Sequence, residues 1–287
     1  MTRILPLSCG HFACEVAPAL GGSIVRLQYD GLDVLRRPPT DLSSARQASS
    51  YPLVPWSNRI GGAWLRWHGQ ERSLARNNPP EPHAIHGTGW QDAWELAEFG
   101  VDRAVLRLVH AADERWPWPF EAVQRFQLAE HALELELSLT NWGEQPMPAG
   151  LGWHPFFVKR PEARVQVRTR GRWEMSPCKL PTHRADHLGL EGPCEGLDVD
   201  HCFDGWEGAA RLEDGRLRVE LTSSLGHIVV FTTPERDVIA LEPVSHVNNV
   251  YGDPAIARHP AALTGARELA PGAAMHARAR IAVRPAR

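Results

Sequence analysis

Two short motifs supply an imidazole and a carboxylate that together could carry acid–base chemistry. His154 stands in the run Trp153 to Phe157, and the proline after it keeps its backbone out of the helical region, which restricts where its side chain points. Glu242 follows the apolar run Val238 to Ala240, so we expect a carboxylate at the mouth of a buried strand. Partial burial would raise its pKa and make it a better base near neutral pH. Taken alone, each motif is more typical of a structural residue, either a core histidine or an ion-pair partner.

Three further segments carry polar side chains that suit a polyhydroxylated ligand. Asn58 and Arg59 place an amide beside a guanidinium rich in hydrogen-bond donors. Asp200, in an Asp-His-Cys-Phe run, could accept two sugar hydroxyls. His86 could contact a substrate, and Gly87 after it, like Gly89, would let the backbone approach a ligand closely.

The spacing of His83 and His86 also raises a zinc interpretation, because two histidines lie three residues apart. We expect no helix here, and no second ligand pair has matching spacing, so we predict no metal. The sequence contains no P-loop, dinucleotide fingerprint or nucleophile elbow. We therefore expect no cofactor.

Composition narrows the class of partner. The 287 residues include 31 basic and 34 acidic residues, for a formal net charge of −3, and no basic run stands out. We therefore expect neither nucleic acid nor a membrane surface as a partner, and no apolar run is long enough for a transmembrane helix. Five cysteines without Cys-x-x-Cys spacing indicate free thiols, and we expect no signal peptide, so the expected location is cytoplasmic. The 11 tryptophans are expected mainly in the core.

The elements that must position these side chains are predominantly β-strands. Apolar and polar residues alternate with a period of two, or form short buried runs, in five segments: Leu133 to Thr140, Val165 to Val167, Leu217 to Leu221, His227 to Thr233 and Ala277 to Val283. The 24 glycines and 24 prolines are spread along the chain as turn signals. This pattern predicts an all-β sandwich or barrel, in a single domain spanning residues 1–287. Pro177 to Pro193 is expected to be a long surface loop.

Three long polar connections are expected to hold the chemistry and to converge on one cleft. They run from Tyr51 to Trp94, from Gly150 to Lys159 and from Leu241 to Pro254. Long ordered connections in compact domains are usually functional.

The order of these motifs resembles the aldose 1-epimerase family, also called galactose mutarotases. The resemblance rests on motifs that follow one another along nearly the whole chain: Asn58-Arg59-Ile60, Gly69, Asn77 or Asn78, Ile85-His86-Gly87, a His-Pro-Phe-Phe motif within Gly150 to Phe157, Asp200 to Phe203, and Glu242-Pro243. Each motif is weak alone, and their common order is specific. The resemblance implies a large antiparallel β-supersandwich with its site on a concave face.

The resemblance also implies the reaction, which is interconversion of the α and β anomers of a free sugar. It assigns Glu242 as base and His154 as acid, which we expect on opposite sides of one sugar ring. Asn58, Arg59, His86 and Asp200 would hold the substrate.

Two departures bear on the identity of the sugar, which stays open. Trp153 replaces the asparagine that family members often carry before the histidine. Thr88 replaces the second glycine of a frequent His-Gly-Gly motif.

Two other functions compete with this one. A hexose-6-phosphate 1-epimerase would need a cationic phosphate clamp. Arg59, Arg66, Arg72 and Arg76 could supply it, but they form no cluster in the sequence, so we expect a neutral aldose. A carbohydrate-binding protein without catalysis would not need a matched acid and base. The oligomeric state is also left open.

Overall fold

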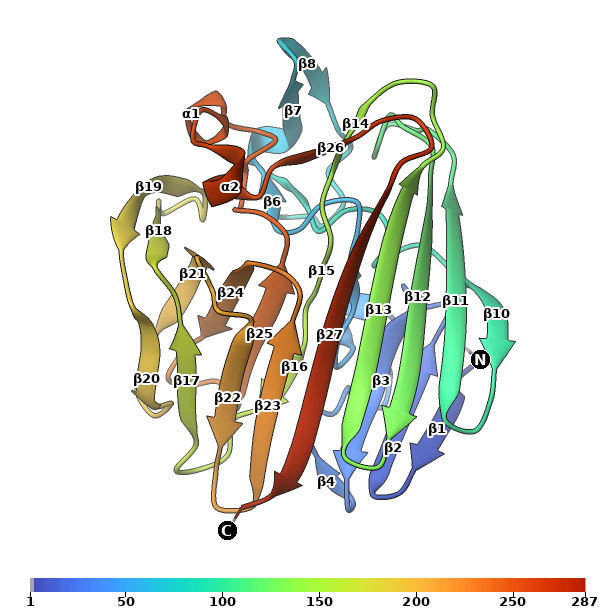
Figure 1. Ribbon diagram of the computed structural model, residues 1–287, viewed down its shortest axis with the longest axis vertical. Coiled ribbons are helices and arrows are strands. Elements are labelled where there is room, and N and C mark those ends of the chain that lie inside the picture. Colours follow the sequence, from blue (N-terminus) through green and yellow to red (C-terminus); the bar gives the residue numbers. More distant parts are fainter. Residues whose placement is uncertain (1–2, 287) are drawn as a thin grey trace.

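The computed structural model describes residues 3–286 and consists mainly of antiparallel strands in two large sheets. Figure 1 shows the first of these sheets, which has nine strands, as the front layer. In spatial order its strands are β10 (Glu95–Phe99), β11 (Arg103–His110), β12 (Phe120–Ala129), β13 (Ala132–Asn141), β27 (Ala274–Pro285), β23 (Leu217–Ser223), β22 (Ala209–Glu213), β17 (Arg164–Arg168) and β20 (Gly189–Pro193).

The second large sheet has eight strands and lies behind the first in Figure 1. Its order is β19 (Pro181–Asp186), β18 (Gly171–Met175), β21 (Val199–Asp204), β24 (His227–Thr232), β25 (Val238–Val244), β15 (Gly152–Trp153) and β5 (Pro52–Leu53). The eighth strand, β16 (Phe156–Val158), also pairs with β25.

Smaller elements surround these sheets. A four-stranded sheet contains β1 (Leu5–Cys9), β2 (Phe12–Ala17), β3 (Ser23–Tyr29) and β4 (Leu32–Asp33). Three strand pairs are β6 (Arg59–Ile60) with β9 (Ala84–Ile85), β7 (Trp64–Trp67) with β8 (Gln70–Ser73), and β14 (Met147–Ala149) with β26 (Arg267–Leu269). The helices are short: η1 (Ala45–Gln47), η2 (Gly61–Ala63), α1 (Pro254–Ala257) and α2 (Ala261–Thr264).

The alternating sequences form strands because the period of two places apolar side chains on one face. In β13 the leucines from Leu133 to Leu139 are buried, while Glu134 and Glu136 between them are exposed. The five segments predicted as strands are strands in the structure. The all-β antiparallel architecture predicted from the sequence is therefore confirmed.

The segment Pro177 to Pro193 was wrongly expected to be a loop. It contains β19 and β20, which lie on the edges of the two large sheets. These strands could not be predicted from the sequence because each has one pairing partner and few buried residues. Their alternation of apolar and polar residues is therefore weak.

The core fills the space between the layers and takes up most of the aromatic side chains. Eight of the 11 tryptophans are buried in one continuous apolar cluster, as their number suggested. All five cysteines are free, as the sequence indicated. Within residues 3–286 no helix is both long and apolar enough to cross a membrane.

Candidate active site

The register of the eight-stranded sheet brings the candidate residues onto one face. Asp200 on β21 lies opposite Phe231 on β24, and Phe231 lies opposite Ala240 on β25, which is itself opposite Phe156 on β16. Glu242 stands two residues beyond Ala240, and residues two apart in a strand share a face. These four strands, β16, β21, β24 and β25, therefore contribute to one pocket.

Glu242 lies within β25, which continues to Val244, so the expectation of a carboxylate just beyond a strand was wrong. His154 lies between β15 and β16. Its Nε2 atom is 3.2 Å from Oε1 of Glu242, and the two side chains are 9% and 3% exposed. This contact leaves no space for a sugar ring between them, so the expected placement on opposite sides of a ring was also wrong.

Burial shifts both members of this pair toward their neutral forms. It raises the pKa of the Glu242 carboxyl well above its ordinary value, and the charge of Asp200 raises it further. Burial lowers the pKa of the His154 imidazole well below its ordinary value, and the neighbouring His86 and Arg36 act in the same direction. A carboxyl that donates a proton to a neutral imidazole is therefore the favoured state of the contact.

Aromatic rings hold the imidazole of His154 in place. It stacks on Phe156 with ring centroids 4.3 Å apart and packs against Tyr51 at 4.8 Å. Burial and then the proximity of Glu242 raise the pKa of the Tyr51 phenol, which keeps this side chain uncharged. His154 and Glu242 thus lie in a buried environment lined by aromatic side chains. Electrostatic interactions are stronger there than in water.

His86 is oriented by a reciprocal pair of hydrogen bonds with Asn58. The backbone N–H of Asn58 donates to Nδ1 of His86 at 3.1 Å, and the N–H of His86 donates to the Asn58 carbonyl at 2.9 Å. Both residues have positive φ, 55° for Asn58 and 62° for His86, a strained conformation that often marks a functional site. Burial lowers the pKa of His86 to about 3, so the ring is neutral and its proton resides on Nε2.

Gly87 and Gly89 allow this loop to pack closely. The sequence predicted that they would let the backbone approach a ligand, but their close neighbours belong to the protein itself. A Cβ atom on Gly87 would lie 2.0 Å from the carbonyl oxygen of Val54, and one on Gly89 would lie 2.3 Å from the Val54 side chain. The amide of Asn77 fixes the same loop by bonding the carbonyls of Ile85 and Gly87. Of the two candidate asparagines, Asn77 is thus structural.

Arg59 and Asp200 line the same pocket and are each ion-paired. Arg59 Nη2 lies 3.3 Å from Glu81, and Asp200 lies 3.1 Å from Lys179. Nε of Arg59 and Oε2 of Glu242 are among the buried atoms here that have no hydrogen-bond partner within residues 3–286. Such atoms are suited to ligand hydroxyls, because a buried polar group left unpaired is costly.

The arrangement of His83 and His86 does not match a zinc site. Nδ1 of His83 accepts the N–H of Gly62 at 2.9 Å, and its Nε2 lies 3.0 Å from the carbonyl oxygen of Cys178. Both ring nitrogens of His83 are therefore occupied by hydrogen bonds. No cluster of three or more potential metal ligands occurs in the described part of the chain.

Trp153, the departure from the family pattern, points away from the pocket. Its indole N–H donates to Gln124 on β12 at 3.1 Å, inside the sandwich. His154, the next residue, lies just beyond β15 and lines the pocket. The tryptophan is a core residue and does not line the pocket.

Sequence reasoning missed several residues of the pocket, above all three arginines. Arg36, Arg46 and Arg236 line it together with Arg59. Arg66 and Arg72, which were considered for the phosphate clamp of the competing function, lie elsewhere. The missed arginines come from segments up to 200 residues apart in the sequence, and no shared motif links them. The nearest sequence signal is the polar loop that begins at Tyr51, another lining residue.

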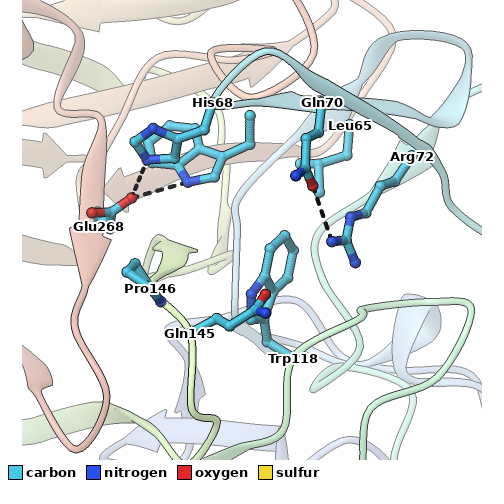
Figure 2. Close-up of a pocket in the computed structure, with 9 residues that line it drawn as sticks. Leu65, His68, Gln70, Arg72, Trp118, Gln145, Pro146 and Glu268 are labelled. Atoms are coloured by element: carbon cyan, nitrogen blue, oxygen red, sulfur yellow. Dashed lines mark hydrogen bonds and ion pairs between the residues drawn. The ribbon is translucent and has the colours of Figure 1, made fainter.

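A second hollow lies beneath the β7–β8 hairpin and shares no residue with this pocket (Figure 2). Its own His–Glu pair, His68 with Glu268, has side chains 66% and 34% exposed. That pair is largely open to solvent, whereas His154 and Glu242 are buried. The other polar groups are used locally, since Trp67 donates to Glu268 and Arg72 donates to Gln70.

Comparison with known proteins shows the family of the chain. The family model of aldose 1-epimerase matches residues 7–255. The chain belongs to the aldose 1-epimerase family. This confirms the resemblance inferred from the order of the motifs.

Three relatives illustrate the similarity. The uncharacterized protein YphB of Escherichia coli K12 is 30% identical over 260 residues, covering 85% of this chain and 88% of the relative. A solved structure of a candidate aldose 1-epimerase from the same organism has a TM-score of 0.89 and 27% identity, with complete coverage of both chains. A galactose mutarotase-like protein from Clostridium acetobutylicum has a TM-score of 0.87 at 18% identity, covering 99% of this chain and 96% of that one. The last similarity is one of fold alone.

Proposed function

We propose that this family member is an aldose 1-epimerase that interconverts the α and β anomers of a free sugar. The observation that carries the proposal is the buried contact between Nε2 of His154 and Oε1 of Glu242. It lies in a pocket that offers an imidazole N–H from His86 and a guanidinium from Arg59 to ligand hydroxyls. A matched acid and base have no evident use in a protein that only binds sugar.

The reaction needs one proton removed from the C1 hydroxyl and one delivered to the ring oxygen. Both oxygens are bonded to C1, so two groups that touch each other can reach both. We assign Glu242 as the base at the C1 hydroxyl and His154 as the acid at the ring oxygen. The bond from C1 to the ring oxygen breaks, which leaves an open-chain aldehyde, a protonated Glu242 and a neutral His154.

Closure reverses these transfers after rotation about the bond from C1 to C2. Glu242 returns its proton to the carbonyl oxygen, and His154 takes the proton of the C5 hydroxyl as the ring forms. The pair ends as it began, so the reaction consumes neither proton nor cofactor.

Burial favours the protonation state that accompanies the open-chain sugar. It raises the pKa of Glu242 and lowers that of His154, so the protonated carboxyl and neutral imidazole are stabilised together. A proton transfer across the contact prepares the charged pair that starts ring opening. Each placed acid or base contributes roughly 10²–10⁴ in rate.

The substrate-binding roles that we propose follow the pocket lining. His86 donates from Nε2, Arg59 donates from its unpaired Nε, and Asn58 and Asp200 accept hydroxyl protons. Anomer exchange followed by NMR on freshly dissolved sugars tests the function. Exchange faster than in buffer supports it, whereas sugar binding without acceleration would favour the carbohydrate-binding alternative.

A further inference from the structure

Three arginines in the pocket have no anionic partner. Arg36 follows β4, Arg46 lies in η1, and Arg236 lies in the turn between β24 and β25. In the part of the chain that the structure describes, none of the three forms an ion pair. Surface arginines are commonly solvated, but three that converge on one pocket create a strongly positive potential there.

The acidic residues of the same pocket do not neutralise these arginines. Glu81 pairs with Arg59 at 3.3 Å, and Asp200 pairs with Lys179 at 3.1 Å. The third acid, Glu242, favours its protonated form beside the imidazole, because burial raises its pKa. The four arginines that line the pocket therefore outnumber its three acids.

Arg36 is held rigidly, as expected of a binding residue. Its Nε and Nη2 donate to the carbonyls of Ala48 and Arg46 at 2.6–2.9 Å, and these bonds do not use Nη1. Burial lowers its pKa to about 10, which still leaves the guanidinium a cation at neutral pH. The segment that carries Arg46 is fixed in turn by the capping box of Ser44 and Gln47.

Phe156 fixes the position of Arg36 relative to the acid. The guanidinium carbon of Arg36 lies 3.5 Å from the centroid of the Phe156 ring, and the imidazole of His154 stacks on the same ring at 4.3 Å. Arg36 and His154, the acid assigned to the ring oxygen, thus contact the same Phe156 ring. In a pyranose the ring oxygen is bonded to C1 and C5. With the C1 hydroxyl at Glu242, the C5 substituent would be the part of the sugar directed toward these cations.

We propose that the substrate is an aldose whose C5 substituent carries a carboxylate or a phosphate, bound by Arg36, Arg46 and Arg236. The proposal rests on the proposed epimerase function and names its substrate class. It replaces the expectation of a neutral aldose, which followed from the lack of a basic cluster in the sequence. The cluster exists in space because the fold assembles it from distant segments.

The test compares matched sugars that differ only at C6: galactose, galacturonate and galactose 6-phosphate, with the corresponding glucose series. Anomer exchange measured by NMR gives kcat/KM for each, and calorimetry gives Kd independently of turnover. The better anion should exceed its neutral counterpart by about 10- to 100-fold in kcat/KM, as one or two charge-assisted hydrogen bonds provide. The advantage should shrink at high salt. A preference for the carboxylate would identify the substrate as a sugar acid, and a preference for the phosphate would identify it as a sugar phosphate.

Variants locate the anion site. Arg236→Gln and Arg46→Gln remove exposed cations and should each lower the anion-to-neutral ratio of kcat/KM by about tenfold. Arg36→Gln should lower it further, with folding checked by thermal unfolding, while the remote surface variant Arg211→Gln should leave it unchanged.

The two proposals fail in different ways. If neutral and anionic sugars are turned over equally well, or all three variants keep the wild-type ratio, the anion site is overturned and the epimerase function stands. If no sugar exchanges faster than in buffer, the epimerase function fails. The Kd values then decide the anion site, because equal affinity for neutral and anionic sugars would overturn it as well.

Discussion

Nε2 of His154 lies 3.2 Å from Oε1 of Glu242, and both side chains are almost fully buried. At this distance the two groups titrate as one unit, so their apparent pKa values belong to the pair. Burial favours the neutral form of each. The active, charged arrangement and the neutral one contain the same number of protons, and they differ only in the position of one proton across the contact.

This relationship predicts a bell-shaped pH dependence of kcat/KM in which the imidazole governs the acid limb. The pair is active with one proton in total. It gains a second as pH falls through the lowered pKa of His154 and loses the first as pH rises through the raised pKa of Glu242. NMR titration of the Glu242 carboxyl carbon and the His154 ring nitrogens assigns the limbs. A carboxyl that ionises below the imidazole would contradict this order.

Glu242→Gln should stabilise the protein at alkaline pH while it removes the base. The folded-state pKa of Glu242 is raised, so its contribution to stability is complete below the unfolded value of about 4.3 and is lost as pH rises through the folded value. The amide has no such loss. We expect a Tm gain of a few degrees at pH 8 that shrinks toward pH 5.

Thermal unfolding across this pH range measures the effect. Glu144→Gln, on an exposed turn, serves as the matched control and should show no pH-dependent gain. A Glu242→Gln variant that is less stable than wild type at pH 8 would show that the carboxyl is held as a favourable anion.

Much of the fold could be predicted from the sequence because local alternation determines which face of a strand is buried. Strands such as β13 and β27 carry this signal over many residues. The edge strands β19 and β20 lack it and were taken for a loop. The motif order likewise indicated the family, since His154-Pro155 and Glu242-Pro243 are visible as short patterns.

The remaining site features depend on register and long-range packing, which no local pattern encodes. The contact of His154 with Glu242 arises because β25 pairs with both β15 and β16. Arg36 and Arg236 meet in one pocket although 199 residues lie between them. Gly87 looked like a ligand-binding glycine, and only the neighbouring Val54 backbone reveals its packing role.

Gly87→Ala should destabilise the protein and impair activity through His86. Gly87 and Gly31 share a φ of 75°, but a Cβ on Gly87 would lie 2.0 Å from the Val54 carbonyl oxygen, while one on Gly31 meets nothing within 4 Å. Gly31→Ala should therefore cost only the backbone strain, about 1–2 kcal/mol. Urea unfolding compares the two variants. Equal losses of stability would mean that the clash with Val54 is relieved at no cost.

Exhaustive chelation should leave anomer exchange unchanged. The predicted chemistry uses only the imidazole of His154 and the carboxyl of Glu242, and the ring nitrogens of His83 are already hydrogen-bonded. The measurement is the exchange rate before and after prolonged dialysis against EDTA. A loss of activity that zinc restores would show that His83 and His86 had been misinterpreted.

The catalytic pair is tested most directly by anomer exchange in Glu242→Gln and His154→Asn, measured by NMR on the purified variants at saturating sugar. Exposed positions provide matched controls, Glu144→Gln and His276→Asn, which should retain wild-type rates. Each active-site variant should fold and still bind sugar, but lose roughly 10²–10⁴ in kcat, the contribution of one placed acid or base. The double variant should lose less than the product of the single losses, because the two groups act as a unit. The assignment would be contradicted if both single variants retained more than about a tenth of the wild-type rate. That rate is far above what the loss of a placed acid or base allows.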